Sequence, residues 1–369
     1  MNKTAIILFL MNVFSLFNAR AQKTAYHQIK GIVLTADTKS PLQGASVFAE
    51  NTTIGTTTDE QGKFILWLPE GGFDLAVSFT GYQTQSQHIS NGNPADLQVT
   101  LSIKEKEMQE VSVVSTGEVK DGWEKYGTFF LEEFLGKTPN SKLCKITNKE
   151  ALRFFYSKRK DRLKVLAKEP LNIDNNALGY RITYELDSFI YEYKTTNALY
   201  TGVPKFDTLI PETPTQSNSW RENREMAYYG SALHFMRSLY RHQLTDDGYE
   251  IQEVSNIDQK EQWKSMDSNE VYDRIKFQRT DSGLVIIQPH AGMLGILYTY
   301  EVPAPEYLAE NPESPNKEFQ LTRLSLTPQK PLYVESNGYY YPQQDVVIND
   351  YWEWTRMADM LPYNYDPEE

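Results

Sequence analysis

The sequence predicts a mainly β protein, in which an N-terminal β-sandwich is followed by an α+β domain with an antiparallel sheet and one long helix. Three observations lead to this fold class. Between residues 29 and 84, short β-rich stretches alternate with turn signals at close intervals, which is the spacing of an antiparallel sandwich. Strand-like stretches return beyond residue 150. One segment, from Trp220 to Leu244, carries apolar residues at helical spacing.

The first 21 residues have the pattern of a secretory signal peptide. Lys3 precedes the apolar run AIILFLMNVFSLF, and Ala19-Arg20-Ala21 places small residues before a cleavage point at Gln22. The run is shorter than the roughly 20 apolar residues that span a bilayer, so it favours a cleaved signal over a membrane anchor. We therefore expect an exported protein that has no transmembrane segment after signal cleavage.

The chain is acidic, with a formal net charge of −12. Loss of the basic residues Lys3 and Arg20 with the signal makes the mature chain more acidic still. Such a surface repels phosphate backbones and anionic lipid, which argues against binding to nucleic acid or to a membrane surface.

The single cysteine, Cys144, makes an intramolecular disulfide impossible. Packed apolar and aromatic side chains must therefore stabilise the fold. In the stretch KLCKIT, alternation lets this side chain point inward, and free cysteine is among the most buried residue types. We expect a buried structural thiol and not a nucleophile.

Residues 22 to 116 are predicted to form the sandwich. In its clearest turn, TIGTTTDEQGKF, Asp59 can accept hydrogen bonds from backbone amides ahead of it, and Gly62 tolerates a positive φ. Alternation at period two assigns the inward-facing positions. These are Val47, Phe48, Phe64, Leu66, Leu68, Leu75, Val77 and Phe79.

Three stretches, KGIVLTADTKSPLQGASV, TIGTTTDEQGKFILWLP and LAVSFTGYQTQ, together resemble the carboxypeptidase regulatory-like domain. That resemblance implies a transthyretin-like β-sandwich of about seven strands. The continuation LQVTLSIKEKEMQEVSVVSTG is similar to the end of this module in TonB-dependent outer-membrane receptors of the polysaccharide-uptake type. The resemblance covers residues 29 to about 116 and implies a Gram-negative envelope protein, either periplasmic or associated with the outer membrane. Beyond residue 117, we recognise neither a receptor plug nor the alternating strands of a barrel.

The name of this family invites a search for a zinc site. A zinc carboxypeptidase uses a His-x-x-Glu pair and a distant His, and none of the five histidines here has that spacing. The sequence also lacks the HExxH, GxSxG, Walker and GxGxxG patterns. We therefore predict no catalytic residue, no metal ligand and no cofactor.

Residues 117 to 369 are predicted to form the α+β domain. In DGWEKYGTFFLEEFLGKTP, aromatic residues recur every three to four positions from Trp123 to Phe134, which predicts an amphipathic helix that ends at Gly136 and covers a β core. ALRFFYS and RLKVLAK flank the basic turn KRKD like a hairpin, and LGYRITYELDSFIYEYKT alternates over two strand lengths.

Beyond Gly248 the pattern again predicts strands, in YEIQEV, VYDRIKF, GLVIIQP, GILYTYEV and FQLTRLSLTP. Asn337-Gly338 predicts a type I′ turn that joins PLYVES and YYYPQQ in a hairpin. The closing stretch DYWEWTRMADMLPYNYDP predicts a short helix and an aromatic tail. This second region is similar to a group of exported envelope proteins that carry the same sandwich, a resemblance that implies no catalytic residue.

The segment from Trp220 to Leu244 presents two stripes at helical spacing. A core stripe comprises Met226, Tyr229, Leu233, Met236, Tyr240 and Leu244. Beside it, small residues are flanked by basic ones, and four of these are candidate ligand-binding residues for a groove that holds an anion or a sugar: Arg224, Ser231, His234 and Arg241. In the alternative interpretation, the small residues allow close packing on a sheet and both arginines pair with local acids such as Glu222 and Glu225.

Two hypotheses for the function follow. The first is a non-enzymatic envelope protein that binds a protein partner or a glycan, because tyrosine and tryptophan suit both kinds of contact and the chain has 24 Tyr and 6 Trp. The second is a hydrolase acting on envelope polysaccharide or peptide, with carboxylates near the Arg224, His234 and Arg241 stripe. The absence of a catalytic template favours the first. The deciding observation is whether His234 and Arg241 converge with a buried carboxylate in a concave pocket or point into ordinary salt bridges.

Overall fold

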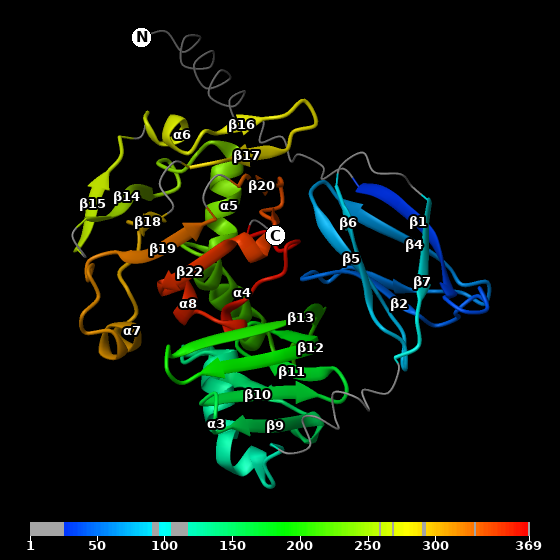
Figure 1. Ribbon diagram of the computed structural model, residues 1–369. Coiled ribbons are helices and arrows are strands. Elements are labelled where there is room, and N and C mark those ends of the chain that lie inside the picture. The colour runs from blue at the N-terminus through cyan, green and yellow to red at the C-terminus, as the bar shows by residue number, and fades with distance from the viewer. Residues whose placement is uncertain are drawn as a thin grey trace, which may run out of the picture.

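The computed structural model describes residues 26–90, 96–104, 117–257, 260–267, 269–289, 293–327 and 330–367. Within these ranges the fold is mainly β, as predicted, with strands in five sheets and a few helices between them (Figure 1). The predicted signal peptide lies outside the described ranges, as does the predicted boundary at residue 116. None of the helices that can be described is long and apolar enough to cross a membrane.

The N-terminal part is a seven-stranded β-sandwich, which confirms the predicted fold of this region. One sheet has the order β4-β1-β7 and the other the order β3-β2-β5-β6. The long strand β1 pairs antiparallel with β4 and parallel with β7. The strands are β1 (Tyr26–Thr35), β2 (Ser46–Ala49), β3 (Gly55–Thr57), β4 (Lys63–Pro69), β5 (Phe73–Ser78), β6 (Gln85–Ile89) and β7 (Asp96–Leu101).

The predicted inward positions of the sandwich are buried, except for Phe79, which is half-buried. Phe48 is buried for a different reason from its neighbours. Val47 and Ala49 belong to the core between the two sheets, so Phe48 points to the opposite face of β2. Residues 51 and 52 hydrogen-bond to a later part of the chain, which therefore covers this outer face.

The turn after β3 has the predicted chemistry but joins strands of different sheets. Asp59 Oδ1 accepts from the backbone amides of Gln61 at 2.9 Å and Lys63 at 2.8 Å. Gly62 adopts a φ of +71°, and a Cβ there would lie 2.6 Å from the carbonyl oxygen of Val33. Because β3 pairs with β2 while β4 pairs with β1, this turn carries the chain from one sheet to the other.

Residues 117 to 212 build a six-stranded antiparallel sheet. The long strand β12 pairs along one edge with β11 and then β10, and along its other edge with β13. Helix α3 (Gly122–Leu135) matches the predicted amphipathic helix, and its Phe130 and Phe134 are fully buried against the sheet. The remaining elements are η1 (Asn140–Leu143), β8 (Cys144–Ile146), η2 (Lys149–Ala151), β9 (Leu152–Ser157), β10 (Arg162–Ala167), β11 (Leu171–Asn175), β12 (Tyr180–Glu192) and β13 (Asn197–Thr208).

The rest of the chain forms two further sheets, with the orders β15-β14-β18-β19-β22 and β16-β17-β20-β21. Helix α5 contributes Phe235, Met236 and Leu239 to a core that both sheets share. The elements are α4 (Pro214–Tyr228), α5 (Ala232–Arg241), β14 (Tyr249–Ile257), β15 (Lys260–Ser265), α6 (Val271–Arg274), β16 (Gln278–Arg279), β17 (Val285–Ile287), β18 (Met293–Tyr298), α7 (Pro305–Glu310), β19 (Gln320–Leu326), β20 (Leu332–Val334), β21 (Tyr340–Tyr341), η3 (Gln343–Asp345), β22 (Val346–Asp350), α8 (Tyr351–Trp354) and η4 (Met357–Asp359).

The predicted long helix is two helices, α4 and α5, because Gly230 breaks it with a φ of +76°. Helical periodicity does not continue across this break. Two residues of the predicted core stripe are therefore exposed, Met226 by 63% and Tyr229 by 42%. Met236 and Leu244, which follow the break, are buried as predicted.

Two other local predictions were wrong. VYDRIKF does not form a strand: Val271 and Ile275 are buried on one turn of α6, whose Ile275 amide donates to the Val271 carbonyl. The predicted hairpin of β20 and β21 forms, but its turn is not type I′ because only Gly338 of the Asn337-Gly338 pair has a positive φ. The Gly338 amide donates to Glu335 and the Glu335 amide to Tyr339.

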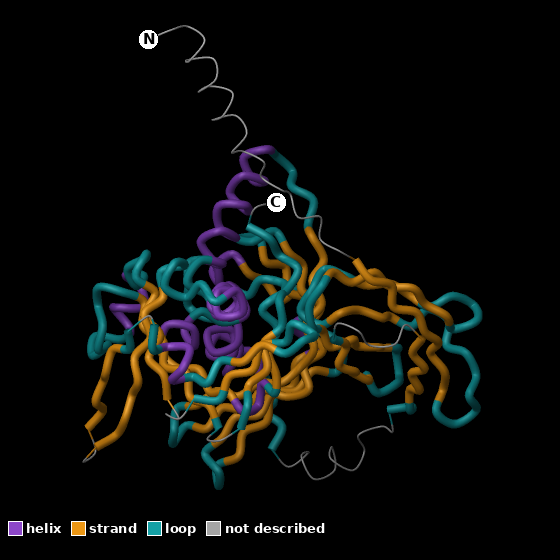
Figure 2. The backbone as a smooth tube through the Cα atoms, turned by 90° about the horizontal axis from the view of Figure 1, so that it is seen from above, coloured by secondary structure: helices purple, strands orange, loops and turns teal. Residues whose placement is uncertain are grey.

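The sandwich packs against the remainder of the chain along β13 and the C-terminal tail. The amide of Asn51 donates to the carbonyl oxygen of Pro204 at 2.7 Å, and that of Phe206 donates to Thr52 at 2.9 Å. From the tail, the Tyr363 amide donates to the Asn51 carbonyl at 2.7 Å. Figure 2 shows the sandwich strands to one side of the helices. The tail thus lies where the sandwich and the later sheets meet.

Candidate functional site

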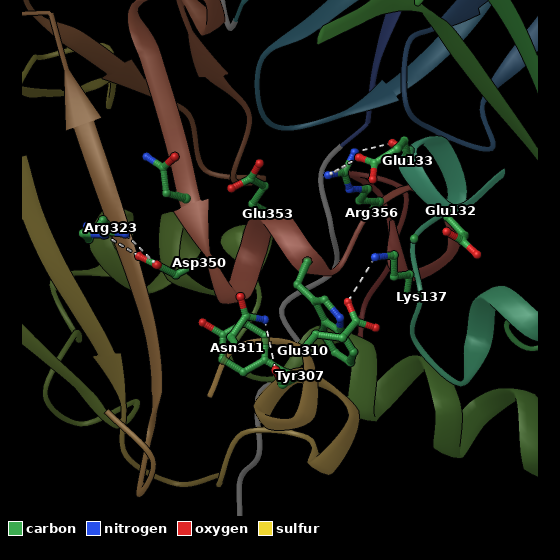
Figure 3. A pocket seen from close by; sticks show the side chains of 13 residues that line it. Glu132, Glu133, Lys137, Tyr307, Glu310, Asn311, Arg323, Asp350, Glu353 and Arg356 are labelled. Atoms are coloured by element: carbon green, nitrogen blue, oxygen red, sulfur yellow. Dashed lines mark hydrogen bonds and ion pairs between the residues drawn. The ribbon is translucent and has the colours of Figure 1, made fainter. Parts of the chain in front are cut away.

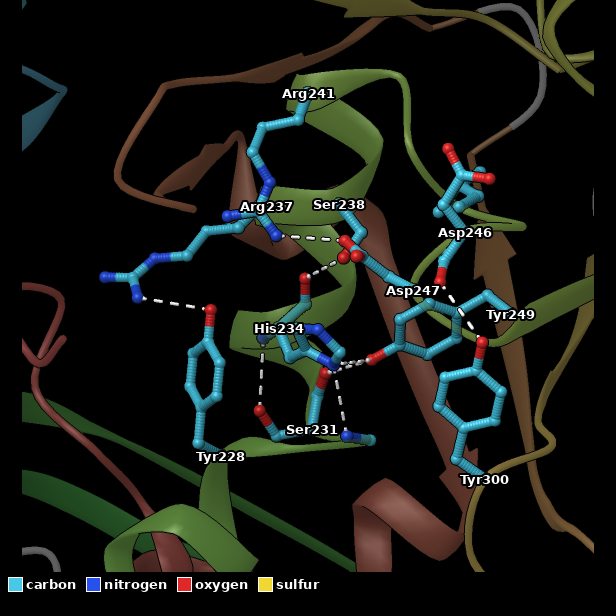
Figure 4. Close-up of polar contacts among 12 residues, drawn as sticks. Tyr228, Ser231, His234, Arg237, Ser238, Arg241, Asp246, Asp247, Tyr249 and Tyr300 are labelled. Carbon is cyan, nitrogen blue, oxygen red and sulfur yellow. Dashed lines mark hydrogen bonds and ion pairs between the residues drawn. The ribbon is translucent and has the colours of Figure 1, made fainter. Parts of the chain in front are cut away.

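The break between α4 and α5 positions the predicted site residues Ser231 and His234. Ser231 is the N-cap of α5, and its Oγ accepts from the His234 amide at 3.1 Å. A serine at this position satisfies one of the amides that a helix start leaves without a partner. The cap fixes the direction of α5, which carries the basic residues of the site (Figure 4).

His234 is buried, with 4% of its surface exposed. Its Nδ1 accepts from the Gly230 amide at 3.2 Å and lies 2.9 Å from the Tyr249 hydroxyl. Nδ1 therefore carries no proton, and the ring is neutral with its proton on Nε2. Burial lowers the pKa of His234 to about 4, so the side chain stays uncharged at neutral pH. Four tyrosine rings surround it: Tyr228, Tyr229, Tyr249 and Tyr298.

Arg241, at the end of α5, forms an ion pair with Asp247, with Nη2 2.9 Å from Oδ2. Both side chains are partly exposed. The arginine thus pairs with an acid, as the alternative interpretation expects, but the acid is neither Glu222 nor Glu225. It belongs to the loop that follows α5.

Arg224 lies apart from the other predicted site residues. Its Nε donates to the Leu178 carbonyl at 2.6 Å, and its guanidinium stacks 4.3 Å from the centre of the Tyr180 ring. Because Gly230 separates α4 from α5, the predicted stripe of site residues is split: Arg224 lies on α4, and the other candidates lie at the start of α5 or along it. Arg224 instead ties α4 to the turn before β12.

Arg237 is a site residue that the sequence prediction missed. Its Nε donates to the Asn337 carbonyl at 3.0 Å, its Nη2 to the Tyr363 carbonyl at 3.0 Å and its Nη1 to the Tyr228 hydroxyl at 3.4 Å. No carboxylate in the described part of the chain forms an ion pair with it. The helical pattern placed Arg237 on neither stripe, and its two carbonyl partners are 100 and 126 residues away along the chain.

Several of the residues described above line a cavity of about 630 Å³ between the sandwich, α5 and the C-terminal tail. His234, Arg237, Arg241 and Asp247 all contribute to its wall, whereas the candidates Arg224 and Ser231 do not. The carboxylate beside His234 and Arg241 is that of Asp247, which is partly exposed and paired with Arg241 in an ordinary salt bridge. The tail that the sequence marks as aromatic supplies much of the rest. The other aromatic and acidic residues that line the cavity are Tyr26, Glu70, Tyr228, Tyr229, Tyr363, Tyr365 and Asp366.

A second, smaller hollow of about 260 Å³ lies between α3, α7 and α8 (Figure 3). Its charges largely neutralise one another. Lys137 pairs with Glu310 at 3.3 Å, and Arg323 Nε lies 2.7 Å from an Asp350 oxygen. In the part of the chain that can be described, no group of three or more His, Cys, Asp or Glu residues could hold a metal ion.

Cys144, at the start of β8, is half-buried, and its Sγ donates to the Asn140 carbonyl at 3.5 Å. Burial raises the pKa of this thiol to about 12. A thiol with so high a pKa is protonated at neutral pH and is a poor nucleophile. The sequence predicted a buried structural thiol; the side chain is only half-buried, and its raised pKa fits a structural role.

Comparison with known proteins covers mainly the sandwich. The chain is 34% identical over 115 residues to the TonB-dependent receptor SusC of Bacteroides thetaiotaomicron, which covers 31% of this chain and 11% of the receptor. It is 31% identical over 115 residues to a TonB-dependent receptor of Formosa agariphila, with 31% and 10% covered. The chain thus spans only about a tenth of the length of these relatives.

Among solved structures, a putative membrane-associated protein of unknown function from Bacteroides fragilis matches at 14% identity with a TM-score of 0.18, covering 44% of this chain and 66% of that one. This match is too weak to bear on fold or function. The family model described as the CarboxypepD_reg-like domain matches residues 29–113. Residues 29–113 therefore match the model of the carboxypeptidase regulatory-like domain, and about a third of the chain is similar to parts of TonB-dependent receptors.

Proposed function

We propose that this is an exported, non-enzymatic protein of the Gram-negative envelope that binds a glycan in the cavity between the sandwich, α5 and the C-terminal tail. The similarity of residues 29–113 to segments of TonB-dependent receptors supports the envelope location. The lining of the cavity supports the choice of ligand. The observation that best supports this proposal is that the guanidinium of Arg237 lies among tyrosine side chains and forms no ion pair in the described part of the chain.

The cavity offers the two kinds of contact that a saccharide needs. A sugar ring has an apolar face that packs on an aromatic ring, and hydroxyls that exchange hydrogen bonds with polar tips. The half-buried Tyr363 and Tyr365 supply both, since each has a flat ring and a phenol. A protein partner covers a surface of about 800 Å², whereas a cavity of about 630 Å³ has the size of a small-ligand site, which favours a glycan.

Arg237 favours a saccharide that carries a carboxylate. Carbonyl and phenol oxygens accept its hydrogen bonds but do not neutralise its positive charge. A guanidinium binds a carboxylate more strongly than a neutral hydroxyl because the hydrogen bonds are charge-assisted. An acidic sugar such as a uronate therefore fits this site better than its neutral counterpart.

The state of His234 supports binding over acid–base catalysis. Its Nδ1 is occupied by the Gly230 amide and the Tyr249 hydroxyl, and its lowered pKa leaves it without an acidic proton to donate near neutral pH. Its role in the proposal is to hold Tyr249 and the start of α5 in place. Arg241 and Asp247 neutralise each other beside it.

The test is isothermal titration of the mature protein with matched neutral and uronate oligosaccharides. We expect the uronate to bind more tightly, and Arg237→Gln to weaken its binding about tenfold, or about 1.4 kcal/mol. Arg221→Gln is the matched control, because Arg221 is an exposed arginine on α4 outside the cavity. Circular dichroism checks that both variants fold. Uronate affinity unchanged by Arg237→Gln, or no binding by any oligosaccharide, would contradict the proposal.

A further inference from the structure

A further cavity, of about 670 Å³, is lined by residues on both sides of the α4–α5 break. Ser231, which the sequence singled out as a ligand-binding residue, lines this cavity and not the one proposed for a glycan. Tyr229 lines both. Among the residues that the structure describes, none of those in the lining is a lysine, arginine or histidine.

The walls of this cavity are aromatic, and their rings are held in place. Trp352 Nε1 donates to the Gly230 carbonyl at 2.6 Å, and the Tyr300 hydroxyl donates to the Asp246 carbonyl at 3.2 Å. The Tyr351 and Trp354 rings lie 5.6 Å apart, centre to centre. Rings fixed in this way need little reordering when a ligand binds.

Large apolar side chains at the rim of this cavity are exposed to an unusual degree. Met226 is exposed by 63%, Tyr300 by 66% and Val302 by 71%. Single exposed apolar residues are common on protein surfaces, but several around one hollow indicate a binding surface.

Two acidic residues, Glu301 and Asp359, complete the lining. Gln320 Nε2 donates to Glu301 at 3.0 Å, while Thr138 Oγ1 and Asn140 Nδ2 donate to Asp359 at 2.7 and 2.8 Å. All these donors are neutral, and neither carboxylate forms an ion pair with a basic residue in the described ranges. The cavity therefore combines electron-rich ring faces with two carboxylates that no basic residue in the described part of its wall neutralises.

We propose that this cavity binds an organic cation, an ammonium group attached to an apolar body. Aromatic faces attract such a cation through their quadrupole, and the two carboxylates add a Coulomb attraction. A strongly hydrated inorganic ion gains little from aromatic walls. A neutral apolar molecule would leave both carboxylates without a counter-charge. This site is separate from the glycan cavity and does not depend on it.

Isothermal titration with choline, against its neutral isostere 3,3-dimethylbutan-1-ol, tests the charge requirement directly. The two molecules share a shape and differ in charge, so we expect choline to bind about tenfold more tightly or better. A parallel titration with Nα-acetyl-lysine methylamide, whose side-chain ammonium group is free, distinguishes a free small cation from a lysine side chain of a partner protein. Preference for either cation over the neutral isostere supports the proposal. Equal affinities, or no binding by either cation, would overturn it.

Two variants of the lining and two controls locate the binding. Glu301→Gln removes one charge and keeps the shape, and Tyr300→Leu removes one ring, so each should weaken cation binding about fivefold. Glu313→Gln, an exposed acid outside the cavity, is the control for Glu301 and should have no effect. Arg237→Gln should also leave cation binding unchanged, which separates this result from the fate of the glycan proposal. Unaltered cation affinity in both Glu301→Gln and Tyr300→Leu would place the ligand elsewhere and refute the assignment.

Discussion

Replacement of Gly230 by alanine tests how the two cavities are held together. Gly230 separates α4 from α5, with a φ of +76°. Its amide donates to His234, and its carbonyl accepts from Trp352, so this one residue contacts the walls of both cavities. An added Cβ would lie 2.6 Å from Cδ1 of Tyr298 and 2.7 Å from Oε1 of Gln320.

The expected cost of Gly230→Ala has two parts. The left-handed backbone costs an alanine roughly 1–2 kcal/mol. The contact with Tyr298 forces that ring or the backbone to move, because no unstrained Cβ approaches an atom so closely, and overpacking of this kind costs about 1–3 kcal/mol. Together they predict a loss of about 2–5 kcal/mol in the free energy of unfolding.

Gly44→Ala is the matched control. Gly44 has the same φ of +76°, but nothing lies within 4 Å of the position that its Cβ would take. Urea unfolding followed by tryptophan fluorescence measures both variants, and the difference between them isolates the crowding. We expect Gly230→Ala to be less stable than Gly44→Ala by about 1–3 kcal/mol. Equal losses in the two variants would refute the claim that Tyr298 and Gln320 confine Gly230.

Two further predictions concern single ionisable groups. Burial raises the pKa of Glu50 to about 7, beside Asp74, Glu185 and Asp187 at the sandwich interface. Because the folded state holds this proton more tightly than the unfolded chain, ionisation of Glu50 lowers stability as the pH rises from about 4.5 to about 7. Glu50→Gln should therefore stabilise the protein by about 2 kcal/mol more at about pH 8 than at about pH 5 in urea unfolding; a gain independent of pH would contradict this. Cys144 should react with iodoacetamide much more slowly in the native protein than in urea at neutral pH, and equal rates would show that its thiol is not shielded.

The parts of the fold that the sequence predicted well depend on local chemistry. Asp59 and Gly62 form their turn through hydrogen bonds and a φ angle within five residues, so the turn could be recognised without knowing the partners of the strands. Helix α3 shows the same pattern, because the spacing of Phe130 and Phe134 already defines its buried face. Which sheets the turn joins depends on distant pairing, and this was not predictable from the turn.

The candidate site depends on contacts that no local pattern contains. Gly230 breaks the helix between Arg224 and His234, although the spacing of residue types in the sequence had suggested one uninterrupted helix. Arg237 is placed by carbonyl groups of Asn337 and Tyr363, which only the folded chain brings together. The sequence predicted the aromatic C-terminal tail, but it could not predict that this tail packs against the sandwich.

The central claim is that the cavity beside α5 binds a saccharide without cleaving it. Its most direct test is titration of the mature wild-type protein with a uronate oligosaccharide, followed by analysis of the recovered sugar for new reducing ends. We predict saturable binding that Arg237→Gln weakens, together with intact oligosaccharide after prolonged incubation. Cleaved product, or no saturable binding, would contradict the account.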